Sequence, residues 1–233
     1  VIRCFEDENI VHVDGEVNPL RDVETINLEL ILSDLELVEK RLEKARKSLK
    51  GNKSFKEEVD LLEKILPVLE EGKSIRTLTF DDNEKAILKN FSLLSVKPII
   101  YVANVNEDDM LDEGRNNEYV KVLADFAKKE NSGIVVISAQ IEKEISELED
   151  DEQVEFLNDL GISESGVSKL IKESYSLLGL MGFLTAGPEE TRAWTIKIGT
   201  SAVNAAGKIH SDIQRGFIRD REKERERQTD RER

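Results

Sequence analysis

The sequence has little cysteine, no long apolar run and no excess of positive charge. Its single cysteine, Cys4, excludes an internal disulfide and is typical of a reducing compartment. No apolar run is long enough to span a bilayer and no signal-peptide pattern is present, so we expect a cytoplasmic protein. The formal net charge of -15 argues against non-specific binding of nucleic acid by the surface as a whole, although local patches can differ.

The chain is rich in both apolar and charged residues. Hydrophobic residues make up 39% and charged residues 36% of the 233 residues, which allows a core that is surrounded by charge-rich helices. This length suits one large or two small domains. Residues 1–15 have the pattern of a strand, a loop and a short extended return. Because Val1 is not a usual start, we expect a piece of a longer protein.

Residues 21–90, which we call the arm, carry the apolar pattern of a helical hairpin. Apolar residues recur at steps of four and three, which is the heptad spacing of a coiled-coil seam. The seam consists of Ile31, Leu35, Val38, Leu42, Ala45 and Leu49. Gly51 and Asn52 break it, and a second apolar repeat follows. We therefore expect two antiparallel helices, the first capped at Asp22 and the second kinked at Pro67.

The tip of this hairpin is basic although the chain as a whole is acidic. Between residues 40 and 56 the only acidic residue is Glu43. One interpretation is a solvated helical surface, and the other is a positive finger that contacts the phosphate backbone of RNA. The residues predicted for that contact are Lys40, Arg41, Lys44, Arg46, Lys47, Lys50 and Lys53, and Lys56 lies beside them.

From residue 81 the pattern changes to strands that alternate with helices. Strands are predicted at 98–102, 133–138 and 193–198, and helices at 82–91, 117–129, 141–160, 166–180 and 202–209. The alternation predicts an α/β fold, a parallel sheet with crossover helices. Ligands of such sheets bind beyond the carboxyl ends of the strands, and Asn104 and Ser138 follow two of those ends.

The loops after these two strands have the order of a nucleotide base pocket. Many P-loop GTPases place Asn-Lys-x-Asp after one strand, where the Asp accepts two hydrogen bonds from guanine. A Ser-Ala pair after the next strand offers a backbone N–H to the base. Here the first loop is Asn104, Val105, Asn106 and Glu107, and the second is Ser138, Ala139 and Gln140. The alternative, loop caps of any Rossmann-like domain, stays open at this point.

Two substitutions change the chemistry of this pocket. Glu107 is one methylene longer than Asp, so its carboxylate does not reach the same place unless the loop shifts. Val105 puts an apolar side chain where GTPases have a lysine stem that covers the base. Adenine carries an amino donor where guanine carries an acceptor, so the changed loop weakens a preference for guanine.

Long stretches of the sequence resemble the YchF-type, Obg-like ATPases. These stretches are residues 3–45, 97–109 (KPIIYVANVNEDD), 147–166 (ELEDDEQVEFLNDLGISESG) and 183–219. The resemblance covers essentially residues 1–219, and its motifs are long and specific. It implies a P-loop nucleotide-binding domain that is interrupted by a helical coiled-coil arm and followed by a TGS domain of β-grasp type.

The resemblance divides the chain into four parts. Residues 1–20 and 91–182 correspond to the C-terminal part of the P-loop nucleotide-binding domain, and residues 21–90 to the inserted arm. Residues 183–219 correspond to a partial TGS module of α+β type. Residues 220–233 contain no apolar residue, so we expect a charged, disordered tail there.

The resemblance also implies an activity and a partner. YchF-type proteins belong to the translation-factor class of GTPases, but they prefer ATP to GTP, use Mg²⁺ and associate with the ribosome. Their Asn-x-x-Glu loop matches residues 104–107 of this sequence. We therefore expect a ribosome-associated P-loop NTPase that binds ATP, and GTP more weakly, and that hydrolyses ATP when intact.

The sequence departs from this family in its phosphate-binding motifs. The 233 residues contain no Gly-x-x-x-x-Gly-Lys-Ser/Thr loop and no Asp-x-x-Gly switch, both of which would precede Val1. We therefore expect no ATP hydrolysis by these residues alone, and we predict no catalytic or metal-binding residue among them. The alternative function is a non-catalytic module that binds ribosomal RNA or protein and keeps a vestigial nucleotide site.

Overall fold

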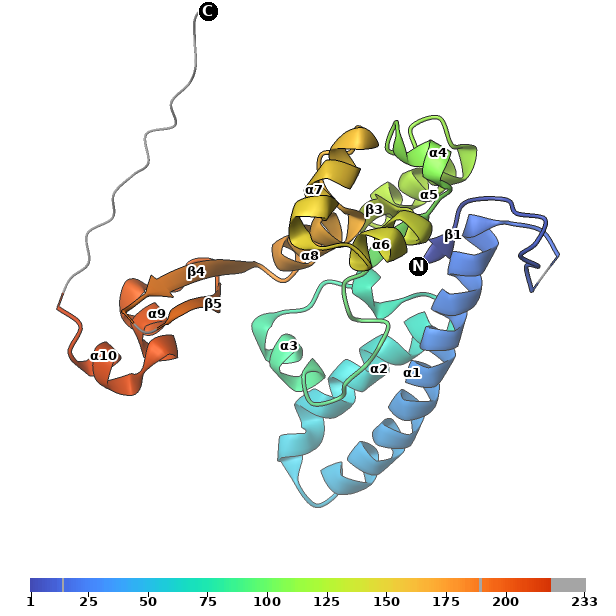
Figure 1. The fold of residues 1–233 in the computed structure, drawn as a ribbon. Coiled ribbons are helices and arrows are strands. Elements are labelled where there is room, and N and C mark those ends of the chain that lie inside the picture. Colours follow the sequence, from blue (N-terminus) through green and yellow to red (C-terminus); the bar gives the residue numbers. More distant parts are fainter. Residues whose placement is uncertain (14, 189, 219–233) are drawn as a thin grey trace, which may run out of the picture. The chain divides into compact units, whose positions relative to one another are not determined.

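Figure 1 shows the chain in a computed structural model, which describes residues 1–13, 15–188 and 190–218. The chain divides into two units, Val1–Glu173 and a second that begins at Ser174. No described helix is both long enough and apolar enough to cross a membrane. The tail predicted at 220–233 lies outside the described residues, and the extents of the four predicted parts stay predictions.

A three-stranded parallel sheet forms the centre of the first unit, which confirms the predicted α/β fold. Its strands lie in the order β1 (Ile2–Arg3), β2 (Ile100–Asn104) and β3 (Gly133–Ile137). Arg3 is in register with Asn104, which is in register with Ile137, so the three strands end at the same edge. β2 runs two residues later than predicted, since Pro98 has no N–H for a ladder and lies outside the strand.

The helices of the first unit connect and cover these strands. They are α1 (Pro19–Leu49), α2 (Lys56–Glu70), α3 (Asp82–Leu88), α4 (Glu107–Met110), α5 (Glu118–Lys129), α6 (Ala139–Ser146), α7 (Asp150–Asp159) and α8 (Gly166–Leu177), of which the last extends past Glu173. Alternate residues of β2, Tyr101 and Ala103, are buried in one cluster with Leu123 of α5 and Ile141 of α6. This cluster is the core beneath the carboxyl edge of the sheet.

Two predictions for the N-terminal region are wrong. The described residues between β1 and α1 form turns and bends, and the extended return predicted there is absent from them. The first helix begins at Pro19 rather than after Asp22, and its N-cap Asn18 accepts a hydrogen bond from the Arg21 N–H at 3.2 Å. The Asn-Pro pair therefore starts the helix, because proline at the first helical position leaves no donor unpaired.

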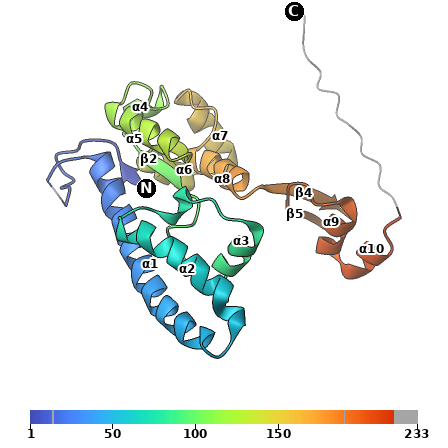
Figure 2. The same ribbon diagram turned by 180° about the vertical axis from the view of Figure 1, so that it is seen from behind.

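The arm is a helical hairpin whose core is the predicted apolar seam. Figures 1 and 2 show α1 and α2 side by side, joined at one end by a short turn that contains the 3₁₀ helix Lys53–Phe55. The seam residues Ile31, Val38, Leu42 and Ala45 are buried, and Leu35 and Leu49 pack against them. Their partners in α2 are Val59, Leu61, Leu62, Ile65 and Leu69. The other 3₁₀ helix, Ile75–Thr77, follows α2.

The second unit contains an antiparallel hairpin and two short helices. β5 (Thr191–Lys197) covers most of the strand predicted at 193–198, and α9 (Ala202–Ile209) confirms the helix predicted at 202–209. Sequence analysis missed β4 (Leu180–Ala186), which pairs with β5 so that Phe183 lies opposite Trp194. α10 (Ser211–Arg215) follows α9.

Gly166 is required where α8 packs on the end of β3. A Cβ at this position would lie 2.5 Å from Ile137 Cγ2 and 2.9 Å from Ile137 Cβ. The Gly166 N–H also donates to Glu142 Oε1 at 2.6 Å, so the start of α8 is held close to α6. We therefore expect Gly166→Ala to lower the free energy of unfolding by about 1–3 kcal/mol in urea titrations followed by circular dichroism.

Gly51→Ala is the matched control for this substitution. A Cβ there meets only Ser48 O, at 3.9 Å, so the added methyl group has open space. This control should change the stability by less than about 1 kcal/mol. Equal unfolding midpoints for the two variants would contradict the close approach of α8 to β3.

Candidate functional site

A cavity of about 600 Å³ lies at the carboxyl edge of the parallel sheet, and we call it the base cavity. Its lining residues are Phe5, Asp7, Ile10, Asn104, Val105, Asn106, Glu107, Asp108, Ser138, Ala139 and Gln140. The structure therefore brings together all seven residues that the sequence predicted for base binding. They meet because β2 and β3 are parallel neighbours whose carboxyl ends share one edge.

A side-chain hydrogen bond ties the two predicted loops together. Asn104 Oδ1 accepts from the Ala139 N–H at 2.9 Å, and the Val105 N–H donates to Ile137 O at 2.9 Å. The Ala139 N–H is therefore bonded within the protein, and its contact with a base stays a prediction. Asn104 Nδ2 makes no hydrogen bond within the described residues, so this donor remains for another partner.

Ser138 places a buried hydroxyl at the same edge. Its side chain is 1% exposed, and its Oγ has no hydrogen-bond partner in the part of the chain that the structure describes. A buried polar atom without a partner is costly, so such groups usually meet a ligand or a protein group. Ser138 Oγ thus offers the base cavity a donor and an acceptor.

Val105 lies in the core and does not form an exposed cover. Its side chain is 2% exposed and belongs to the buried cluster that contains Ala103 and Leu123. The chain remains extended past Asn104, and the two-residue period of a strand puts Val105 on the buried face with Ala103. The prediction that an apolar side chain here replaces the lysine stem over a base is therefore wrong.

The other predicted residues of these loops are accessible. Asn106 and Glu107 are exposed at the start of α4, and Asn106 caps this helix without a side-chain hydrogen bond. Gln140 Nε2 donates to Glu144 Oε1 at 2.8 Å, so this amide is held along its own helix. The groups open to a ligand are therefore the Glu107 carboxylate and the Asn106 amide.

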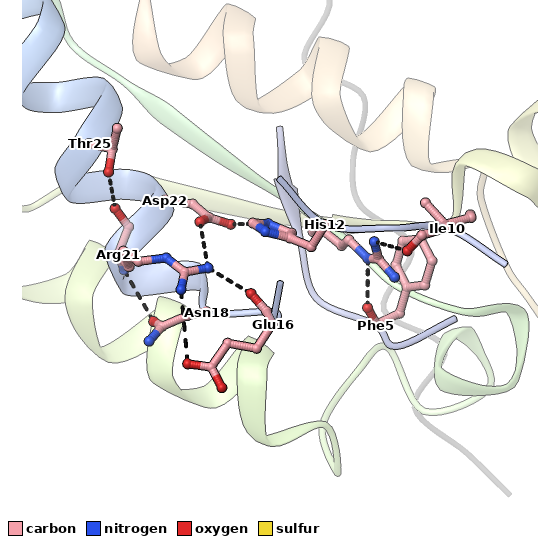
Figure 3. A network of polar contacts seen from close by, with 9 residues as sticks. Phe5, Ile10, His12, Glu16, Asn18, Arg21, Asp22 and Thr25 are labelled. Atoms are coloured by element: carbon pink, nitrogen blue, oxygen red, sulfur yellow. Dashed lines mark hydrogen bonds and ion pairs between the residues drawn. The ribbon is translucent and has the colours of Figure 1, made fainter. Parts of the chain in front are cut away.

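Sequence analysis missed the third wall of the base cavity, which is formed by the loop after β1. Arg3 holds this loop, because its Nε donates to Phe5 O at 2.9 Å and its Nη1 to Ile10 O at 2.8 Å. Its guanidinium also lies 4.7 Å from the centroid of the Phe5 ring. Figure 3 shows Phe5 and Ile10 on this loop. An arginine inside a short strand gives no sequence signal for such a role.

The same loop contacts the start of α1 through a polar network, shown in Figure 3. His12 Nε2 lies 3.1 Å from Asp22 Oδ2, and Arg21 Nη2 lies 3.6 Å from Asp22 Oδ1. Arg21 also donates to Glu16 O at 2.6 Å.

The thiol of Cys4 lies near this network. Burial is the larger cause, and the charge of Asp22 the smaller, that raises the pKa of this thiol to about 12, so Cys4 is an inert core residue at neutral pH.

The basic arm tip divides into paired and unpaired cations. Four of the seven cations predicted for RNA contact lie in ion pairs within the arm. The pairs are Lys40–Glu36, Arg41–Glu58 (2.8 Å), Arg46–Glu63 (2.7 Å) and Lys47–Glu43 (2.6 Å). Hydrogen bonds from Lys40 and Lys47 lower the pKa values of the Glu36 and Glu43 carboxyls, respectively. These four cations therefore carry little free charge toward a partner.

The remaining cations cluster around the turn between α1 and α2. Lys44, Lys50, Lys53 and Lys56 are exposed, and none makes a side-chain hydrogen bond or ion pair to a described residue. We call these four residues the free lysines. They surround the turn, so the positive finger predicted from sequence is confined to a smaller part of the arm.

Known proteins resemble this chain over nearly its whole length. Proteins named ribosome-binding ATPase YchF, from Pasteurella multocida (strain Pm70) and Bacillus subtilis (strain 168), are 46% and 49% identical over 220 residues. The solved structure of the Schizosaccharomyces pombe YchF GTPase is 34% identical, with a TM-score of 0.79 over 93% of this chain. This chain belongs to the YchF family.

The match to YchF proteins covers only part of those proteins. The alignment with the curated YchF relatives covers 94% of this chain but only about 60% of the length of those relatives. The chain likewise covers 59% of the S. pombe chain. The family model YchF-GTPase_C, described as a protein of unknown function (DUF933), matches residues 180–222. The α/β fold and the YchF family are thus established for the aligned residues, whereas activity and partners need a separate argument.

Proposed function

We propose that this chain carries the base-reading part of a nucleotide site that prefers ATP to GTP, in a protein that associates with ribosomes. The observation that carries the proposal is the meeting of the two predicted loops in one cavity, tied by Asn104 and Ala139. The YchF relatives are named ribosome-binding ATPase, and this name supports both the ATP site and the association with ribosomes. Association with ribosomes also supports a cytoplasmic location.

The polar groups of the base cavity fit a purine base. Asn104 Nδ2 is a free donor, Ser138 Oγ is a buried hydroxyl without a partner, and Glu107 is an exposed acceptor. A carboxylate accepts donors, and adenine offers an amino group on its Watson–Crick edge. We propose that Glu107, whose longer side chain does not take the position of the GTPase Asp, favours adenine over guanine.

We propose ATP hydrolysis only for a polypeptide that contains these residues together with a phosphate-binding loop. The residues printed here contain no Gly-x-x-x-x-Gly-Lys-Ser/Thr motif, so we assign no transfer step to them. Across residues 1–13, 15–188 and 190–218, no three His, Cys, Asp or Glu side chains are grouped to hold a metal ion. We assign no Mg²⁺ ligand among these residues.

The second unit has a separate proposed identity. We propose that it is the beginning of a TGS domain, because residues 180–222 match YchF-GTPase_C and the β4–β5 hairpin lies within this match. The alternative function, a non-catalytic module with a vestigial nucleotide site, is favoured by a different observation, the free lysines of the arm tip. Both functions share the ribosome contact and differ in whether the base cavity binds a nucleotide.

Nucleosides test the base cavity without requiring phosphate contacts. We expect adenosine to shift the amide resonances of residues 104–107 and 138–140 in NMR titrations of this chain, and guanosine to bind more weakly. Glu107→Asp should raise guanosine affinity relative to adenosine by roughly tenfold, because a shorter carboxylate regains two hydrogen bonds to guanine.

Glu118→Asp is the control, since Glu118 is an acidic residue at the start of another helix, α5, outside the base cavity. It should leave the ratio of the two affinities unchanged. Absence of saturable shifts with adenosine would favour the vestigial site. An unchanged ratio in Glu107→Asp would show that other groups choose the base.

A further inference from the structure

A groove of about 450 Å³ lies on the arm beside the free lysines, and we call it the arm groove. Its apolar part includes Leu37, Ala45 and Phe55, and its polar part includes Arg41 and Lys44. This size lies within the range of small-ligand pockets, and it suits one flat ring with its attached group. The groove is therefore more than a row of surface charges.

Three flat side chains, those of Arg41, Phe55 and Phe91, line the arm groove. The Arg41 guanidinium carbon lies 4.2 Å from the centroid of the Phe91 ring, and its Nε donates to Glu58 Oε1 at 2.8 Å. These contacts hold the guanidinium in place while its side chain stays 38% exposed. Phe55, in the 3₁₀ helix of the turn, is partly exposed and lines the same groove.

Positive charge lies at the edge of these flat surfaces. Lys44 lines the groove, is exposed, and has no hydrogen-bond or ion-pair partner in the described chain. The other free lysines, Lys50, Lys53 and Lys56, surround the adjacent turn. A strand of RNA combines these two features, because each nucleotide has a planar base and a negative phosphate. An acidic peptide matches the charges, but its carboxylates make no use of the flat ring of Phe55.

We propose that the arm groove takes one unstacked base of single-stranded RNA while Lys44 and the other free lysines contact the neighbouring phosphates. This inference rests on the proposed function, in that the arm tip contacts ribosomal RNA. Bases in a duplex are stacked and cannot enter such a groove, whereas unpaired bases stack readily on aromatic rings and on arginine. The arm therefore distinguishes RNA loops and single strands from duplex RNA.

The test compares single-stranded and duplex RNA in fluorescence anisotropy with the full chain. Phe55→Leu removes the ring but keeps an apolar side chain, so single-stranded RNA should bind roughly tenfold more weakly. Duplex RNA should bind the variant as it binds the parent. Phe80→Leu is the matched control, because Phe80, like Phe55, is a partly buried ring. Its ring centroid lies 4.9 Å from Lys64 Nζ, and the residue lies outside the arm groove. This control should change neither affinity, and circular dichroism checks the helix content of both.

The outcomes separate this inference from the function on which it rests. Equal losses for both RNAs in Phe55→Leu, or no loss for either, overturn the base-stacking role. Displacement of RNA by polyglutamate, with the same sensitivity to Phe55→Leu, identifies an acidic-peptide site and also overturns it. If replacing the four free lysines by Gln changes no RNA affinity, or the parent binds no RNA, the proposed RNA contact fails as well.

Discussion

Replacing Lys44, Lys50, Lys53 and Lys56 by Gln is expected to weaken ribosome binding by on the order of a hundredfold at moderate salt. These residues are the exposed cations of the tip that form no ion pair with a described residue. The body of the protein is acidic, with a formal net charge of -15, so RNA repels it and a contact needs a positive element that projects from it. The hairpin of α1 and α2 provides that projection (Figure 1).

The salt dependence gives the sharper measurement. Each lysine that neutralises a phosphate releases counterions, and the slope of log affinity against log salt falls by about 0.7–0.9 for each contact that is lost. We therefore expect a slope flatter by about 3 in ribosome co-sedimentation between roughly 50 and 200 mM salt. Gln is a comparable helix former, so the hairpin should keep its helix content.

The matched control is the replacement of Arg46, Lys47, Lys73 and Lys121 by Gln, which leaves the arm groove intact. Both variants lose four positive charges, but in the control these charges already neutralise Glu63, Glu43, Glu71 and Glu118. The control should keep most of the slope of the parent chain. Equal slopes of log affinity against log salt in the two variants would show that only the total charge matters. If the free-lysine variant co-sediments with ribosomes as the parent does, the arm tip is not a ribosome contact.

The division between free and paired cations could not be predicted from the sequence. The sequence shows eight cations and one acid between residues 40 and 56, and it groups Arg46 with Lys44 and Lys50. The partners Glu58 and Glu63 come from α2, and which cation each one reaches depends on how the two helices cross. The apolar seam, by contrast, was predictable, because the spacing along one helix alone decides which face is buried.

A similar contrast holds for the base cavity. The meeting of Asn104 with Ala139 follows from a general property of parallel strands, so the sequence predicted it from the strand order. The inward position of Val105 depends on how far β2 extends, and the strand was placed two residues too early. The wall held by Arg3 belongs to an irregular loop, where no periodicity shows which carbonyls a guanidinium reaches.

Asp34→Ala is expected to lower the free energy of unfolding of the first unit by about 3–5 kcal/mol. Asp34 lies on α1 and is 2% exposed. It accepts three hydrogen bonds, from the Leu94 N–H at 2.9 Å and from the Ser95 N–H and Oγ–H, both at 2.7 Å. The carboxylate thus fixes the segment that connects the arm to β2. Its removal leaves three donors without an acceptor, two of them on the buried Ser95.

Urea unfolding followed by circular dichroism measures this effect, and two variants sharpen it. Asp34→Asn keeps an acceptor oxygen but loses the charge, so it should fall between the parent and Asp34→Ala. Asp60→Ala, on the exposed side of α2, is the control and should change stability by less than about 0.5 kcal/mol. A loss under about 1 kcal/mol in Asp34→Ala would mean that water or a shifted loop satisfies these donors, and that the arm is anchored mainly by its apolar core.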